Sequence, residues 1–193
     1  MSDWFRTIGD IEAAAGNAEE LAAAMIGWLV EAGIVAADRT DCVLGSELGY
    51  PPGPNYADAM TEPDTTLGRL RTNGLEVITG RQVFDFGEGE VVNAGCPHCA
   101  ATIRLIDDHW ELDDRVWGPF GDAIHAWHGG AAGIVSCAVC AKPVELNDWR
   151  WNPEWGFGYL GFKFWNWPSL APGFVTEFAG RLGHRVVCPA SKL

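Results

Sequence analysis

Two Cys-x-x-Cys pairs, at residues 96–99 and 137–140, constrain the fold of this chain more than any other feature of its sequence. Each spacing allows one tight turn to present two thiolates to a single metal ion, and two such turns complete a tetrahedral shell of four sulfur atoms. Sulfur ligands in this arrangement select zinc or iron over hard cations. The sequence therefore predicts one Zn²⁺ site formed by Cys96, Cys99, Cys137 and Cys140.

Such a shell leaves no open coordination position for water or substrate, so we expect the zinc to be structural rather than catalytic. Metal binding should then contribute directly to folding, because four unliganded thiolates would repel one another. A shell of three cysteines and one histidine is an alternative, with His98, His125 or His128 as the fourth ligand. His125 and His128 lie three residues apart in a predicted helix, and surface histidines are the more ordinary interpretation.

The tetrapeptide Cys96-Pro97-His98-Cys99 also resembles the active-site sequence of thiol oxidoreductases of the DsbA type. That resemblance implies that Cys96 attacks a disulfide and Cys99 resolves the product, with a helix N-terminus lowering the pKa of the first thiol. Residues 91–95 lack the aromatic strand expected ahead of that motif, and the second Cys-x-x-Cys pair would have no role. Thiol–disulfide exchange is therefore a second hypothesis.

Short strand-like runs flank the cysteine pairs, at residues 91–92, 134–135 and 143–146. With the cysteines they resemble a zinc ribbon over about 50 residues, and a predicted helix at 119–128 accounts for the long separation of the pairs. The segments 161–168 and 182–187 are similar to a group of uncharacterised bacterial proteins with a central zinc ribbon. This second resemblance implies an architecture and no established activity.

Apolar residues at helical spacing predict three helices, at residues 18–32, at 119–128 and beginning at Pro172. Asn17 and Glu20 match a capping box at the start of the first helix. Pro119 suits the first position of the second helix.

Residues 75–79 and 82–86 are typical of two strands joined by a two-residue hairpin turn. Residues 156–167 are rich in aromatic side chains, as a buried strand would be. Residues 45–74 contain four prolines and are predicted to be irregular, and a loop of this length is usually functional or mobile.

Together these elements predict an α+β fold, a mostly antiparallel sheet with packed helices that is interrupted by a zinc-ribbon-like subdomain. The predicted parts are an acidic N-terminal part at 1–92, the insert at 93–147 and an aromatic-rich C-terminal part at 148–193. The first and third parts are expected to form one domain, which suits a chain of 193 residues.

The net charge of −13 is concentrated in the first half, where residues 1–92 hold 16 acidic and 5 basic residues. An acidic surface repels nucleic acids and anionic membranes, and it suits a basic protein partner. No segment is long and apolar enough to span a bilayer, and residues 1–4 show no secretory signal, so we expect a cytoplasmic protein. The last three residues, 191–193, match a peroxisomal address that is common by chance.

Nine aromatic residues occur between positions 149 and 167. Most of them are expected to form the core, because large aromatic side chains dominate core packing. Trp149, Trp151 and Trp155 alternate with polar residues, so they are the predicted exposed set and the candidate interaction surface.

The sequence contains no catalytic motif whose flanking residues suit the structure that the motif needs. Residues 156–161 match Gly-x-Gly-x-x-Gly, but an aromatic segment ending at Pro168 follows where a dinucleotide site needs a helix. The leading hypothesis is a non-catalytic, cytoplasmic zinc-binding protein that acts by protein–protein interaction, as an immunity or inhibitor protein against a basic partner would. A thiol–disulfide oxidoreductase and a zinc-ribbon nucleic-acid adaptor are the alternatives.

Overall fold

The computed structural model describes residues 3–87 and 90–192. These residues form three α-helices and ten β-strands in antiparallel sheets, which confirms the predicted α+β fold. The helices are α1 (Ala18–Glu31), α2 (Asp114–His128) and α3 (Pro172–Leu182). The strands are β1 (Trp4–Asp10), β2 (Leu75–Phe84), β3 (Asn93–Gly95), β4 (Thr102–Arg104), β5 (Ile134–Ser136), β6 (Pro143–Glu145), β7 (Arg150–Asn152), β8 (Gly156–Trp165), β9 (Val186–Val187) and β10 (Ala190–Lys192).

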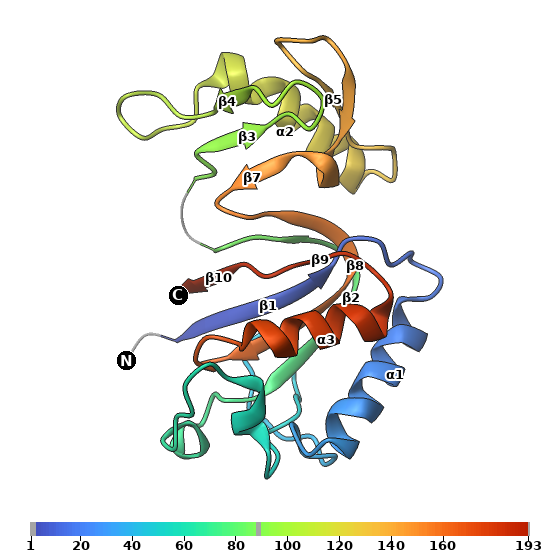
Figure 1. The fold of residues 1–193 in the computed structure, drawn as a ribbon, viewed down its shortest axis with the longest axis vertical. Coiled ribbons are helices and arrows are strands. Elements are labelled where there is room, and N and C mark those ends of the chain that lie inside the picture. Colours follow the sequence, from blue (N-terminus) through green and yellow to red (C-terminus); the bar gives the residue numbers. More distant parts are fainter. Residues whose placement is uncertain (1–2, 88–89, 193) are drawn as a thin grey trace.

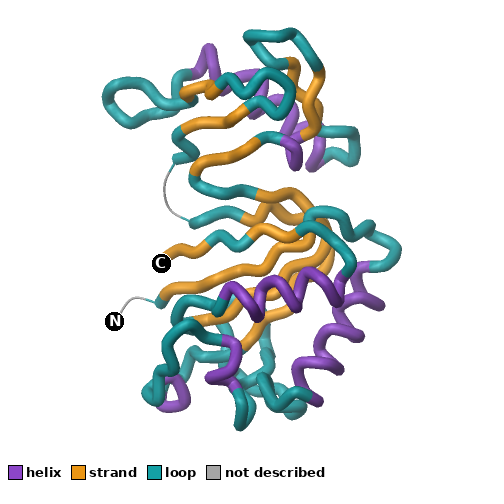
Figure 2. Tube along the Cα trace, in the orientation of Figure 1, coloured by secondary structure: helices purple, strands orange, loops and turns teal. Residues whose placement is uncertain are grey.

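The molecule has two lobes, one above the other in Figure 1. The sheet lobe, residues 3–87 and 156–192, contains the five-stranded sheet with the strand order β10-β1-β8-β2 and with β9 beside β1. The cysteine lobe, residues 91–152, contains α2, the sheet β4-β3-β7 and the hairpin β5-β6 (Figure 2). The predicted domain boundaries at residues 92 and 147 stay a prediction.

Helices α1 and α3 pack against one face of the main sheet and enclose its core. Trp28 of α1 stacks on Phe174 of α3, and Phe178 meets Phe162 of β8 edge to face. The predicted periodicity of α3 is confirmed, because Phe174, Phe178 and Leu182 are its buried residues. Helix α1 also forms where expected, but the side chain of Asn17 does not cap it. It accepts a hydrogen bond from the backbone N–H of Ala14 instead.

Helix α2 is longer than predicted, because it begins at Asp114 and contains Pro119 in its interior. The side chain of Asp113 accepts a hydrogen bond from the backbone N–H of Arg115 and caps the helix. The helix therefore begins directly after the Asp113 cap, which satisfies a free N–H, and the prediction that Pro119 is its first residue is wrong.

The predicted hairpin at 75–86 is wrong. Residues 75–84 form one continuous strand, β2, and both of its halves pair with β8. The register shifts between Thr79 and Gln82, and Gly80 has a φ of 111°. The Gly80-Arg81 pair is therefore a β-bulge, which turns the strand locally without reversing it.

The other face of the main sheet has a trough of glycines filled by one aromatic ring. Gly9 of β1 lies opposite Gly161 of β8, and the ring of Phe84 covers both. A Cβ atom on either glycine would lie 2.4 Å from that ring. Glycine is required at these positions for close packing, which accounts for part of the Gly-x-Gly-x-x-Gly match without any nucleotide.

Residues 45–74 contain only two 3₁₀ turns, at Tyr56–Ala59 and Leu67–Arg69, as the predicted irregularity implies. The segment is nevertheless attached to the core, since the indole N–H of Trp167 donates to the carbonyl of Asn73 at 2.6 Å. Met60 and Leu67 are buried against the same core.

The prediction that Trp149, Trp151 and Trp155 are exposed is wrong. Trp149 and Trp151 are 3% and 8% exposed, and both meet the ring of Phe120 edge to face. Trp155 is half-buried and packs on Trp117. Alternation with polar residues indicated a solvent-facing edge, but α2 covers β7 and encloses these rings in the core of the cysteine lobe.

No helix within residues 3–87 and 90–192 is long and apolar enough to cross a membrane. The secretory signal and the peroxisomal address considered above involve residues 1–2 and 193. These residues lie outside the described part of the chain.

Candidate metal centre

Each Cys-x-x-Cys pair occupies the turn of a short antiparallel hairpin. The first turn joins β3 to β4 and the second joins β5 to β6. In both turns the first cysteine donates its backbone N–H across the turn, Cys96 to Ala101 at 2.8 Å and Cys137 to Lys142 at 2.9 Å. The residue after each second cysteine is left-handed, with φ near 59° at Ala100 and 58° at Ala141. The two turns are therefore built alike.

The structure brings the four predicted ligands together. All four Sγ atoms lie within 4.8 Å of one another. The closest pairs are Cys96 with Cys140 at 3.9 Å and Cys99 with Cys137 at 3.8 Å. Four sulfurs bound to one zinc at about 2.3 Å stand about 3.8 Å apart at tetrahedral angles, whereas disulfide sulfurs stand about 2.05 Å apart. The spacing suits a metal-bound thiolate shell, and the cysteines are not disulfide-bonded.

The electrostatics of the cluster also favour a cation at its centre. Backbone N–H groups of Cys140 and Val139 lower the pKa of Cys137 to about 6. For Cys99, the N–H of Ala101 acts in the lowering direction, but burial and the neighbouring thiols together raise its pKa to about 11. An ionised Cys137 thus opposes ionisation of Cys99. A divalent cation between them would stabilise both thiolates and remove this repulsion.

The cluster of ligand atoms in the described residues contains no histidine. His98 is exposed, with its ring nitrogen 3.4 Å from the carbonyl of Pro143. The shell of three cysteines and one histidine is therefore not the arrangement that the structure brings together.

The fold of the first cysteine pair also bears on the thiol oxidoreductase hypothesis. Cys96 directly follows strand β3 and is buried, and the turn that it begins leads into β4 rather than into a helix. The N-terminal helix dipole that would activate Cys96 is missing from this site. The thiol whose pKa is lowered is Cys137, in the second pair.

No family model, no curated protein and no solved structure matches the chain.

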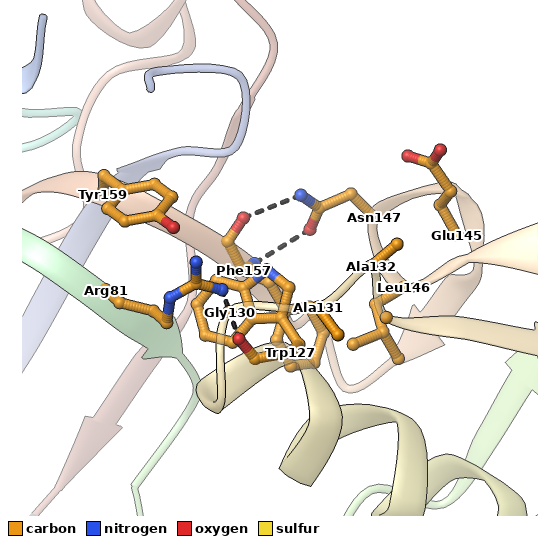
Figure 3. A pocket seen from close by; sticks show the side chains of 11 residues that line it. Arg81, Trp127, Gly130, Ala131, Ala132, Glu145, Leu146, Asn147, Phe157 and Tyr159 are labelled. Atoms are coloured by element: carbon orange, nitrogen blue, oxygen red, sulfur yellow. Dashed lines mark hydrogen bonds between the residues drawn. The ribbon is translucent and has the colours of Figure 1, made fainter. Parts of the chain in front are cut away.

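A second candidate is the cavity between the two lobes, which has a volume of about 340 Å³ (Figure 3). Arg81, projected by the bulge in β2, lies between the rings of Trp127 and Tyr159, with its guanidinium carbon 4.7 and 4.8 Å from their centroids. It also donates to the carbonyl of Trp127 near the end of α2. A cation at that position complements the helix dipole.

Asn147 makes the other polar connection across this cavity. Its side chain donates to the carbonyl of Phe157 and accepts from the N–H of the same residue (Figure 3). It also donates to the carbonyl of Ile11. Both Arg81 and Asn147 are thus engaged in joining the lobes. The cavity is better explained as the seam between the lobes than as a ligand site.

We expect Arg81→Met to lower the free energy of unfolding by about 1–3 kcal/mol, because it removes a charge-assisted hydrogen bond and two cation–π contacts. Urea unfolding monitored by tryptophan fluorescence measures the change. Arg69→Met is the control, since it removes the same charge from an exposed position. Equal stability of the two variants would contradict the role given to Arg81.

Cys188 should be chemically inert in this protein. Burial and then the Glu154 carboxylate raise the pKa of Cys188 to about 12. Because only the thiolate is nucleophilic, Cys188 should react with iodoacetamide only as the pH approaches 12. When a chelator removes the bound metal, the cysteine lobe is expected to unfold and its thiols to regain ordinary pKa values. Peptide mass spectrometry at pH 8 should then find label on the four cluster cysteines and none on Cys188. Labelling of Cys188 at a comparable rate would show that this environment does not persist in solution.

Proposed function

We propose that the chain binds one structural Zn²⁺ through Cys96, Cys99, Cys137 and Cys140, and that it acts by binding a basic protein. The closed four-sulfur cluster carries the first part of this proposal, because the chain itself supplies all four positions of a tetrahedral shell. With no position left for substrate, the ion would hold the two hairpins of the cysteine lobe together.

The interaction role is supported by an exposed aromatic residue in acidic surroundings. Trp110 is 71% exposed, on the loop between β4 and α2 that projects from the cysteine lobe in Figure 1. Five of the eight residues at 107–114 are acidic, and none is a lysine or an arginine. A large apolar anchor inside a charged rim is typical of protein-binding hot spots, and the charge selects a basic partner.

Hydrogen bonds within the loop order the backbone around Trp110 in the absence of a partner. The carboxylate of Asp107 accepts hydrogen bonds from the N–H groups of His109 and Glu111, at 2.7 and 3.1 Å. Asp107 also donates its own N–H to the carbonyl of Glu111 at 2.7 Å. A preorganised loop loses little conformational entropy on binding. We therefore propose Trp110 as the candidate interaction surface in place of Trp149, Trp151 and Trp155, none of which is exposed.

More specifically, we propose that the chain is an immunity or inhibitor protein in the cytoplasm. The net charge of −13 supports this role, because it favours binding to a basic toxin or enzyme. The same charge opposes the nucleic-acid adaptor alternative, because an acidic chain repels a phosphate backbone.

The test is a pulldown from native cells at low salt with the zinc-loaded protein as bait. We expect a stoichiometric basic partner that is released as the salt concentration rises and is lost with Trp110→Ala. Leu44→Ala is the matched control, because Leu44 is an exposed apolar residue of the other lobe and its loss should leave binding intact. Recovery of no stoichiometric partner, or equal loss with both variants, would defeat the interaction proposal and leave the metal site untouched.

A further inference from the structure

Arg6 differs from every other arginine in the described residues. Only Arg6 and Arg81 are not exposed. Arg81 has a carbonyl and two aromatic rings as partners, whereas the side chain of Arg6 has no hydrogen bond, ion pair or aromatic contact within residues 3–87 and 90–192. Its Nε atom is buried without a hydrogen-bond partner.

This lack of a partner is unusual in so acidic a chain. The protein has 26 Asp and Glu residues, and in the part that the structure describes none of them forms an ion pair with Arg6. Burial lowers the pKa of Arg6, but an arginine stays charged at neutral pH even so. Because Arg6 is only half-buried and its charge has no partner in the described residues, the guanidinium can pair with an anion from outside the chain.

Arg6 lines a surface cavity of about 480 Å³. The cavity lies at the edge of the main sheet, beside the first residues of β1 and beside β10. Its lining residues are Trp4, Phe5, Arg6, Pro168, Ala190 and Ser191. The indole N–H of Trp4 donates to the carbonyl of Trp167 at 3.1 Å, which fixes one wall. Mostly apolar walls with one charged group are the usual composition of a small-molecule site.

We propose that this cavity binds a small carboxylate with an apolar body, whose carboxylate group pairs with the guanidinium of Arg6. A guanidinium presents its N–H groups in the geometry that a carboxylate accepts. The apolar body would lie against Trp4 and Pro168. The net charge of −13 repels a phosphate dianion more strongly than a carboxylate of single charge, which favours the carboxylate. This site is separate from the metal centre and from Trp110, and it goes beyond the proposed function.

Benzoate is the probe, with the zinc-loaded full chain labelled with ¹⁵N. The Arg6 Nε–H signal, assigned by its disappearance in Arg6→Lys, should shift saturably with millimolar benzoate. Benzamide has nearly the same shape and no charge, and it should produce no such shift. An unmoved Arg6 signal at saturating benzoate, or an equal response to benzamide, would overturn the proposal.

The variant test uses Arg6→Gln and follows the indole N–H signal of Trp4, which remains observable without the arginine. We expect benzoate to bind at least about tenfold more weakly, as the loss of a charge-assisted hydrogen bond implies. Arg69→Gln, at an exposed position, should bind like the unchanged protein. If Arg6→Gln is folded and binds benzoate equally well, the proposal is wrong. If Arg6→Gln does not fold, the comparison of benzoate with benzamide in the unchanged protein tests the proposal by itself.

Discussion

Cys137→Ser is expected to abolish zinc retention and to unfold the cysteine lobe while the sheet lobe stays folded. Structural zinc contributes roughly 10–16 kcal/mol of apparent binding free energy in small zinc-dependent folds, which exceeds the stability of a typical domain. The hairpins that carry the ligands have strands of only three residues each. Native mass spectrometry would measure the metal, and hydrogen exchange would locate the unfolded segment.

Residues of α2 and β3 to β7 should lose protection in this variant, and α1, α3 and β8 should keep most of theirs. A chelator should reproduce the same pattern in the unchanged protein. Cys188→Ser is the matched control, because Cys188 lies outside the cluster and its loss should leave one zinc per chain. A Cys137→Ser protein with unchanged zinc content and unchanged protection would rule out this metal centre.

Trp167→Ala is expected to lower the free energy of unfolding of the sheet lobe by about 3–5 kcal/mol, the usual cost of deleting a buried aromatic side chain. Trp167 is fully buried, and its ring meets Phe164 and Tyr56 edge to face. The variant also removes the hydrogen bond to Asn73, so residues 56–73 should exchange their amide hydrogens faster. Urea unfolding and hydrogen exchange measure the two effects.

Trp110→Ala is the comparison for this variant, since a 71% exposed side chain should contribute less than about 0.5 kcal/mol to folding. Trp167→Phe retains most of the ring volume and should fall between the two. If Trp167→Ala leaves the exchange of residues 56–73 unchanged, the attachment of this segment to the core through Trp167 is wrong.

The metal cluster could be predicted because its geometry is encoded locally. A Cys-x-x-Cys turn fixes two ligands within four residues, so only the meeting of two turns remained to be shown. Helix α3 could be predicted equally well, since its buried residues recur every four positions and Gly183 ends it with a φ of 72°.

The errors arose where the partner of a segment decides its structure. Gly80-Arg81 has the composition of a hairpin turn, but β8 is long enough to pair with both halves of β2, so the two residues form a bulge. Likewise, Trp151 on β7 and Trp149 just before it have the polar neighbours of exposed residues, but the ring of Phe120 on α2 packs against both. Trp110 was missed because a single tryptophan among acidic residues shows no periodicity, and only its exposure distinguishes it.

The packing of Phe84 over Gly9 and Gly161 suggests how distant relatives of this chain could be recognised. Any side chain larger than hydrogen at either glycine would displace the ring, and a smaller residue at position 84 would open a void. Substitutions at these three positions should therefore be correlated in evolution, although they lie far apart in the sequence. A profile that couples two small residues on neighbouring strands to one aromatic residue would detect this sheet even in proteins that have lost the cysteines.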